Sequence, residues 1–307
     1  MNTCFLMLSF FCFIMHSQKI SSNSIERIIG GIDANIQSAP YQLQMRIINN
    51  NDNQYICSAS IINIHLAVTA AHCILAAKDP LKEIIIKSGC SFLYEKCNVH
   101  NIINFVIHEN YNSIINDYDI AVIEVSPTFT YNHFTKAVDL ALNKNVYTEW
   151  GKVCGWGYHS KNNDYDDDIN PILANTLQCI QIPQISKRQC SEYYKYRYII
   201  TRRMLCYGFQ NGKKDACKGD SGAGLVNKDN VLLGITSWGD GCGEINSPGV
   251  YTDARFLAPW INSIIKITKE RHTYDYKYGC VLFEIITQIL KYIVVVSNIC
   301  LTFMSYN

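Results

Sequence analysis

Three separated residues have side chains that could act together on a carbonyl group. Ser221 lies in Asp215–Gly222 (DACKGDSG), His72 lies in Val68–Cys73 (VTAAHC), and Asp119 lies in Asp117–Val122 (DYDIAV). A serine hydroxyl needs a base to take its proton, and a carboxylate can orient that base. Taken singly, these residues fit a turn, a packed histidine and a helix cap. The chain order His, Asp, Ser matches one of three unrelated orders of hydrolytic triads.

The composition and the N-terminus indicate a globular protein made for an oxidising compartment. The 307 residues are 48% hydrophobic and 17% charged, as in ordinary globular proteins. The formal net charge of +1 lacks the excess of basic residues typical of proteins that bind nucleic acid, so no nucleic-acid partner is expected. The fourteen cysteines favour an extracellular location. Residues 5–15 are apolar and too short to span a bilayer. We therefore expect a signal peptide over residues 1–17 and secretion, with an uncleaved anchor as the alternative.

The elements that must position the three residues are mostly strands. Short β-branched and aromatic runs alternate with turn-forming clusters, which predicts an all-β barrel or sandwich. The expected strands include residues 41–48, 83–87, 102–108, 120–125 and 231–237. Helices are expected over residues 259–269, with Pro259 in the first turn, and over residues 186–196, with Ser186 as the N-cap. The acidic residues 162–170 are expected to form an exposed loop.

The three motifs together resemble the trypsin/chymotrypsin family of serine proteases, over about residues 28–269. The resemblance implies an all-β fold of two six-stranded antiparallel barrels, with the active site in the cleft between them, plus a C-terminal helix. It implies that Ser221 is the nucleophile, His72 the base and Asp119 the group that orients His72. The backbone N–H groups of Gly219 and Ser221 would form the oxyanion hole. The chain departs from the family at Ala223, a position expected to be strained if its φ is positive.

The resemblance also implies a primary specificity pocket with an acidic floor. Asp215 matches that floor, and a buried carboxylate there requires a cationic substrate side chain. The residues that match the rest of the pocket are Ala216, Ser237, Trp238, Gly239 and Gly249. Because Ala216 offers no hydroxyl to a lysine, we expect Arg to be preferred over Lys. The implied substrates are proteins or peptides with Arg or Lys before the cleaved bond.

Residues 26–31 (ERIIGG) resemble the activation site of the family. Cleavage after Arg27, by another trypsin-like protease, would release the α-ammonium group of Ile28. In the family this group pairs with the Asp that precedes the nucleophile, here Asp220. Residues 18–27 would then be an activation propeptide, and the chain would be made as a zymogen. A turn after a processing site is the plain alternative.

The family resemblance implies some of the cysteine pairs, and the others are expected among the cysteines that the family pairing leaves unassigned. Family pairing implies the bridges Cys57–Cys73, Cys190–Cys206 and Cys217–Cys242. Cys154 and Cys179 remain, on what should be adjacent strands, and we expect them to pair. A local bridge between Cys90 and Cys97 is also expected. The loop between them offers Glu95 and few other oxygen ligands, so we expect no calcium, no other metal and no cofactor.

Residues 270–307 extend beyond the resemblance. Residues 280–304 are apolar and long enough for a membrane span, although Glu284, Gln288 and Lys291 interrupt them. Membrane attachment and a tail docked on the protein both stay open. A bridge between Cys280 and Cys300 would exclude a continuous helix across that stretch.

The leading hypothesis is a secreted, monomeric serine endopeptidase whose partners are its substrates, protease inhibitors and an activating protease. The alternative is a weak or inactive homologue that acts as a binding protein. The sequence leaves the physiological substrate open.

Overall fold

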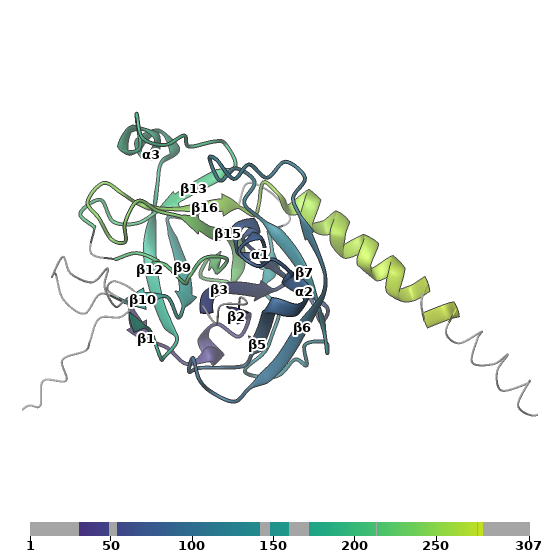
Figure 1. Cartoon of the computed structure of the whole chain (residues 1–307). Helices are drawn as coiled ribbons and strands as arrows, with labels where there is room; N and C mark the ends of the chain where they lie inside the picture. Colours follow the sequence, from purple (N-terminus) through teal and green to yellow (C-terminus); the bar gives the residue numbers. More distant parts are fainter. Residues whose placement is uncertain are drawn as a thin grey trace, which may run out of the picture.

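The computed structural model describes residues 31–48, 54–141, 148–159, 172–212, 214–274 and 276–278. The predicted signal peptide and propeptide, with Arg27 and Ile28, lie outside the described residues. So do the acidic residues 162–170 and the apolar residues 279–307. The described chain forms two barrels and a long C-terminal helix (Figure 1).

The first barrel is a closed ring of six antiparallel strands. In ring order these are β2 (Gln42–Ile48), β3 (Gln54–Ile61), β4 (Leu66–Thr69), β7 (Ala121–Ser126), β6 (Asn98–Ile107) and β5 (Ile84–Ser88). Pairing of β5 with β2 closes the ring, with Met45 opposite Ile86. Alternate side chains point inward in such a barrel, and Leu43, Met45 and Ile47 are all fully buried. Closure removes exposed sheet edges.

The second barrel also closes through six antiparallel strands. They are β9 (Trp150–Gly155), β12 (Gln178–Ile185), β13 (Met204–Tyr207), β16 (Gly249–Asp253), β15 (Val231–Trp238) and β14 (Gly224–Val226). The β9–β12 pairing and the contact of Val226 with Lys152 complete the ring. Strand β1 (Ile32–Asp33) pairs with β12, and β8 (Asp139–Leu140) pairs with β15. Strand β10 (Tyr158–His159) pairs antiparallel with β11 (Ile172–Leu173) in a separate two-stranded sheet. The predicted two-barrel fold is confirmed.

Short helices connect the strands, and a longer one follows the last strand. They are η1 (Ile36–Ser38), α1 (Ala71–Leu75), α2 (Pro80–Glu83) and α3 (Lys187–Tyr193). As predicted, Ser186 caps α3: its Oγ accepts a hydrogen bond of 3.2 Å from the Gln189 N–H. Residues 258–274 form the C-terminal helix, which projects from the barrels (yellow-green in Figure 1).

The C-terminal helix is longer than expected, and residues 276–278 are helical too. The expected domain end at residue 269 therefore falls inside a continuous helix. Two residues just beyond that point contact β7: Arg271 and His272 both donate to the buried Glu124 carboxylate, His272 Nε2 at 2.7 Å. No helix among the described residues is long and apolar enough to cross a membrane.

Within the described part of the chain, five disulfides join the cysteine pairs expected from the sequence. They are Cys57–Cys73, Cys90–Cys97, Cys154–Cys179, Cys190–Cys206 and Cys217–Cys242. Cys154 and Cys179 are direct cross-strand partners on β9 and β12, which explains why the bridge can form between these adjacent strands of the second barrel. Cys280 and Cys300 lie outside the described residues.

Candidate active site

Strand pairing in the first barrel brings His72 and Asp119 together. His72 lies at the start of α1, just after β4, and Asp119 lies two residues before β7. Since Thr69 on β4 pairs with Ala121 on β7, residues 47 positions apart become neighbours. Asp119 Oδ2 accepts a hydrogen bond of 2.7 Å from His72 Nδ1, and Oδ1 accepts one of 3.0 Å from the His72 backbone N–H. The carboxylate thus holds both the imidazole ring and its backbone.

The second barrel completes the surroundings of Asp119. Ser237 Oγ donates to Asp119 Oδ2 at 2.5 Å, and Thr252 Oγ1 donates to the Asp119 carbonyl oxygen at 2.8 Å. Asp119 is fully buried. Thr252 was not identified from the sequence, because a threonine inside a strand looks like any other strand residue. Donors on both carboxylate oxygens fix the orientation of the Asp119 side chain.

The surroundings of His72 favour its protonated form. Burial alone would lower the pKa of His72, but the hydrogen bond that His72 donates to Asp119 and the negative charge of Asp119 together outweigh burial and raise that pKa above its usual value. The His72 side chain is still 32% exposed, so a substrate could reach it. An accessible imidazole with a raised pKa can accept and return a proton.

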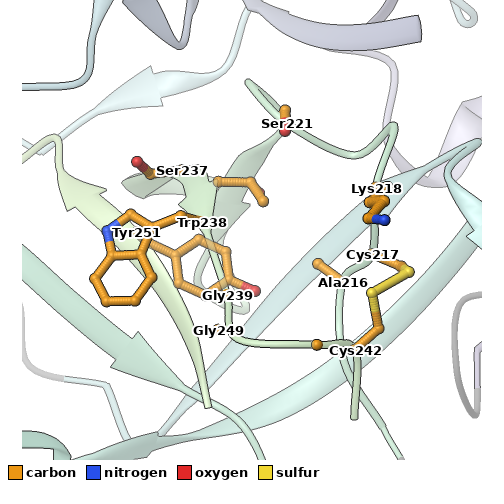
Figure 2. Close-up of a pocket in the computed structure, with 12 residues that line it drawn as sticks. Ala216, Cys217, Lys218, Ser221, Ser237, Trp238, Gly239, Cys242, Gly249 and Tyr251 are labelled. Carbon is orange, nitrogen blue, oxygen red and sulfur yellow. A yellow bond between two sulfur atoms is a disulfide. The ribbon is translucent and has the colours of Figure 1, made fainter. Parts of the chain in front are cut away.

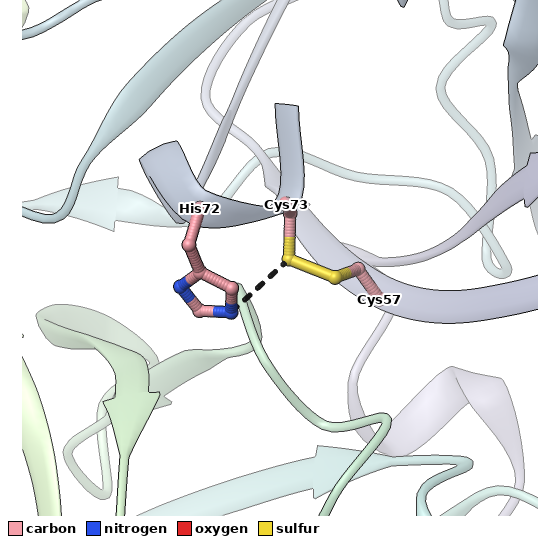
Figure 3. Close-up of side chains that lie close together, drawn as sticks. All are labelled: Cys57, His72 and Cys73. Carbon is pink, nitrogen blue, oxygen red and sulfur yellow. Dashed lines mark hydrogen bonds between the residues drawn. A yellow bond between two sulfur atoms is a disulfide. The ribbon is translucent and has the colours of Figure 1, made fainter. Parts of the chain in front are cut away.

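Ser221 lies beside His72, at the junction of the two barrels. Its carbonyl oxygen accepts a hydrogen bond of 2.7 Å from the Ser58 N–H of β3. Cys73 Sγ lies 3.7 Å from that same carbonyl oxygen and 3.7 Å from His72 Nε2 (Figure 3). No hydrogen bond joins Ser221 Oγ to the His72 ring in the structure. Catalytic hydrogen bonds of this kind commonly tighten only when substrate is bound.

Two glycines shape the turn that carries Ser221. Gly219 has φ +99° and Gly222 has φ +84°, both in the left-handed region. A Cβ added at Gly222 would lie 2.2 Å from the Ser58 carbonyl oxygen, so only glycine fits there. Neither the Gly219 N–H nor the Ser221 N–H is hydrogen-bonded to another described residue. Two free donors next to a candidate nucleophile could bind a developing oxyanion.

Ala223 is not strained. It is absent from the non-glycine residues with positive φ in the described chain, and its methyl group is buried in the core of the second barrel. The strain considered from the sequence therefore does not arise. The added methyl group instead contributes to packing.

The carboxylate of Asp220 is fully buried beneath the same turn. It accepts hydrogen bonds from the backbone N–H groups of Gly157, at 2.8 Å, and Cys217, at 3.0 Å. Burial nevertheless raises the pKa of Asp220 to about 6. A Cβ at Gly155 would lie 2.1 Å from Asp220 Oδ1, so glycine is needed to make room for the carboxylate. A cation placed here would restore the charged form of Asp220.

A cavity of about 220 Å³ lies next to Ser221 (Figure 2). Its lining includes most of the residues predicted for the specificity pocket, namely Ala216, Ser237, Trp238, Gly239 and Gly249, together with the Cys217–Cys242 bridge and Tyr251. Lys218 lies on the same wall, between Cys217 and the turn of Ser221. The cavity is thus bounded by two strands of the second barrel and a disulfide.

Asp215 lies directly behind the cavity wall and is not itself among its lining residues. It is 2% exposed, and a Cβ added at Gly249 would lie 2.8 Å from its Oδ1. Asp215 Oδ2 accepts one long hydrogen bond of 3.3 Å from the Gly243 N–H, whereas Oδ1 has no hydrogen-bond partner. Burial raises the pKa of Asp215 to about 7. This carboxyl group is buried without adequate partners.

One group of potential metal ligands gathers within the described part of the chain, and its chemistry does not suit a metal. It consists of Cys57, His72 and Cys73. The two sulfurs are bonded to each other, as Figure 3 shows, so neither is a thiolate. Thiolate, not disulfide sulfur, is the metal ligand in proteins.

Comparison with known proteins agrees with this geometry. The family model described as Trypsin matches residues 28–261. Trypsin zeta of Drosophila melanogaster is 35% identical over 251 residues, which cover 78% of this chain and 86% of that protein. Hypodermin-B of Hypoderma lineatum is 33% identical over 241 residues, 78% of this chain and 88% of that protein. Coagulation factor XI of Bos taurus is 33% identical over 245 residues, 76% of this chain but 37% of that larger protein.

Proposed function

The chain belongs to the trypsin family of serine endopeptidases, and from that premise we propose that it hydrolyses peptide bonds after Arg, and less readily after Lys. The observation that carries this specificity is the buried Asp215 carboxyl group behind the cavity, with one oxygen unpartnered. Breaking a buried ion pair leaves a costly unpaired charge, so a guanidinium that completes the pair binds strongly. Ala216 supplies no hydroxyl to a shorter ammonium group, which favours Arg.

The proposed reaction proceeds through an acyl-enzyme. Ser221 Oγ attacks the carbonyl carbon while His72 takes the hydroxyl proton, and the N–H groups of Gly219 and Ser221 bind the oxyanion. His72 then gives that proton to the leaving amine, and water repeats the sequence to release the product. Asp119 holds the imidazole so that Nε2 faces Ser221, because its own bond is to Nδ1.

We further propose that the chain is made as a zymogen. Cleavage after Arg27 would supply the Ile28 α-ammonium as the partner of Asp220. The buried Asp220 carboxyl, with a pKa of about 6, supports this role because a cation would favour its ionised form. Asp220 lies between Gly219 and Ser221, so its position also decides where the two oxyanion-hole donors point. An activation step on this residue can therefore control catalysis.

The five disulfides and the apolar N-terminal run support secretion. The proposed enzyme is a monomer, and its proposed partners are substrate proteins and peptides and protease inhibitors. The hydrogen-bonded Asp119–His72 pair counts against the alternative, an inactive homologue that only binds other proteins. An inactive protein has no need to keep both.

The test is hydrolysis by purified full-length protein before and after treatment with trypsin immobilised on beads, which are then removed. Matched peptides carry Arg, Lys, Phe or Leu before the cleaved bond. We expect activity only after treatment, with Ile28 as the new N-terminus, and in the order Arg, Lys, then the neutral residues. Equal activity before treatment would refute the zymogen, and preference for Phe or Leu would refute the specificity.

Two variants are the controls. Ser221→Ala should lose turnover by about six orders of magnitude, since triad members act as a unit. Arg27→Gln should stay inactive after treatment with trypsin. Hydrolysis by Ser221→Ala at the wild-type rate would mean that residual trypsin, or another nucleophile, does the work.

A further inference from the structure

The segment just before Asp119 has an unusual backbone. Asn116 has φ +50° and Tyr118 has φ +54°. Left-handed backbone is uncommon for residues other than glycine, and for a bulky aromatic residue it persists only where the surroundings hold it. Asp117, between the two, pairs with Asn112 through backbone hydrogen bonds of 2.9 and 3.2 Å. This local pairing leaves the side chains of Asp117 and Tyr118 free to contact other elements.

An arginine of the second barrel holds this segment from the other side. Arg203, one residue before β13, donates from Nε to Asp117 Oδ1 at 2.9 Å and from Nη2 to Oδ2. Thr201 Oγ1 donates to the same Oδ1 at 2.8 Å. The two charged side chains are 17% and 8% exposed, so solvent screens them little. A two-pronged arginine–carboxylate pair adds geometric precision as well as energy.

The same guanidinium also stacks on Tyr118. The Arg203 Cζ lies 4.7 Å from the centre of the Tyr118 ring. The ring stacks on His108 at 4.5 Å, and His108 lies 4.8 Å from the indole of Trp260 in the C-terminal helix. Burial lowers the pKa of His108, against the charges of Glu109 and Asp117, so its ring faces Tyr118 in the neutral form. A column of four side chains therefore runs from the second barrel to the C-terminal helix.

We propose that Arg203 is a positioning residue: paired with Asp117 and stacked on Tyr118, it holds the segment 116–118 so that the Asp119 carboxylate meets His72. The inference rests on the proposed triad. This role is more specific than holding the two barrels together, because Arg203 contacts Asp117 and Tyr118, the two residues that immediately precede Asp119. The remaining contacts of Asp119 from the second barrel, Ser237 and Thr252, bind Asp119 itself. Small displacements of catalytic groups have large kinetic effects.

The first test measures turnover. Arg203→Gln removes the positive charge and the two guanidinium N–H donors that bind the Asp117 carboxylate. We expect kcat of the activated protein to fall about 10- to 100-fold, with little change in KM for an Arg peptide. Arg203→Lys keeps the charge but cannot donate two parallel hydrogen bonds, so its kcat should lie between those of Arg203→Gln and wild type. In a double-mutant cycle, adding Asp117→Asn to Arg203→Gln should cost little more, since the two residues act together.

The second test does not need activity. In the Ser221→Ala background, the pKa of the His72 imidazole is followed by proton NMR, with its signal identified by its loss in His72→Ala. Asp119 raises this pKa, so a displaced Asp119 should lower it, by about half a unit or more, in Arg203→Gln. The matched control is Arg271→Gln, which also removes an arginine from a buried carboxylate, that of Glu124 on β7. The side-chain partners of Glu124 are Asn104, Arg271 and His272, and His72 is not among them. The control should leave kcat and the His72 pKa unchanged.

The outcomes separate the inference from the proposed function. Arg203→Gln with wild-type kcat and wild-type His72 pKa, even with a lowered melting temperature, overturns the positioning role. If activated wild type does not cleave peptides, the proposed function fails, while the titration of His72 still decides whether Arg203 positions Asp119. If Arg203→Gln does not fold, Arg203→Lys and Asp117→Asn are titrated in the same way, and an unshifted His72 pKa in both overturns the proposal.

Discussion

Two buried aspartates of this protein have opposite surroundings. Asp119 is fully buried, and its carboxylate accepts three hydrogen bonds, two from His72 and one from Ser237. Asp215 is equally hidden, yet it accepts one long bond from Gly243 and leaves Oδ1 without a partner. Burial raises the pKa of Asp215 to about 7. Residues of the protein supply the hydrogen-bond donors of Asp119, whereas they leave one oxygen of Asp215 available to a donor from outside the protein.

The comparison separates a group that organises catalysis from one that selects a ligand. A carboxylate whose donors are all internal is preorganised and does not have to rearrange during the reaction. A carboxyl group whose donor is missing reduces stability, and that lost stability reappears as affinity when a cation arrives. The same substitution at the two positions should therefore have different consequences.

The largest effect is expected for Asp119→Asn in the activated protein. The amide would present an N–H toward His72 Nδ1 and favour the wrong tautomer, so kcat should fall about 10⁴-fold. The measurement is steady-state hydrolysis of an Arg peptide amide, and KM should change little. A loss below tenfold would mean that Asp119 does not orient His72.

Asp215→Ser should have a smaller and substrate-dependent effect. Arg substrates should lose about 2–5 kcal/mol of transition-state stabilisation, as when one partner of a buried charge pair is removed. Leu and Phe substrates never used the charge and should lose far less. The check is kcat/KM on matched peptides, with Asp119→Asn as the variant that lowers all of them. An equal loss on every substrate would remove Asp215 from the pocket.

The raised pKa of Asp215 predicts that selectivity depends on pH. In the free enzyme Asp215 is protonated below about pH 7, so its attraction for Arg should weaken by up to tenfold per pH unit as the pH falls. The ratio of kcat/KM for an Arg peptide to that for a Leu peptide isolates this change, because protonation of His72 affects both substrates alike. We expect the ratio to fall between pH 8 and pH 5.5. A flat ratio would show that the empty pocket already holds an ionised Asp215.

The smallest effect concerns stability, measured by thermal unfolding in the Ser221→Ala background. The folded-state pKa of Asp215 lies above its unfolded value of 3.8, so its contribution to stability is present below about pH 4 and is lost as the pH rises through about 7. Asp215→Asn should thus stabilise the protein by about 1 kcal/mol at pH 8, and this gain should disappear by pH 4. The full shift corresponds to about 4 kcal/mol, but the amide keeps an unpaired polar atom. Asp119→Asn should destabilise at pH 8, and stabilisation by both variants would remove the contrast.

Much of the site was predictable from local sequence, because each element of the chemistry requires particular residue types beside one another. Gly222 shows the reason: its φ of +84° and its approach to the Ser58 carbonyl oxygen permit no side chain, so glycine must follow Ser221. The strands were likewise visible as β-branched runs, since a barrel demands buried alternate positions. The sequence by itself therefore determined the candidate triad and an all-β barrel or sandwich, and its resemblance to the trypsin/chymotrypsin family supplied the two six-stranded barrels and the residues of the pocket.

Tertiary structure alone decided which side chains support these groups. Arg203 and Asp117 are 86 residues apart, and nothing beside either one indicates the other. Their contact exists because the two barrels pack together with the start of β13 opposite the segment before β7. In the same way, Arg271 and His272, which lie past the expected end of the C-terminal helix, both contact Glu124 of β7, which lies 147 and 148 residues earlier in the chain. Short-range patterns report the local backbone and the reacting groups, whereas the partners of a buried charge are set by how distant strands close into barrels.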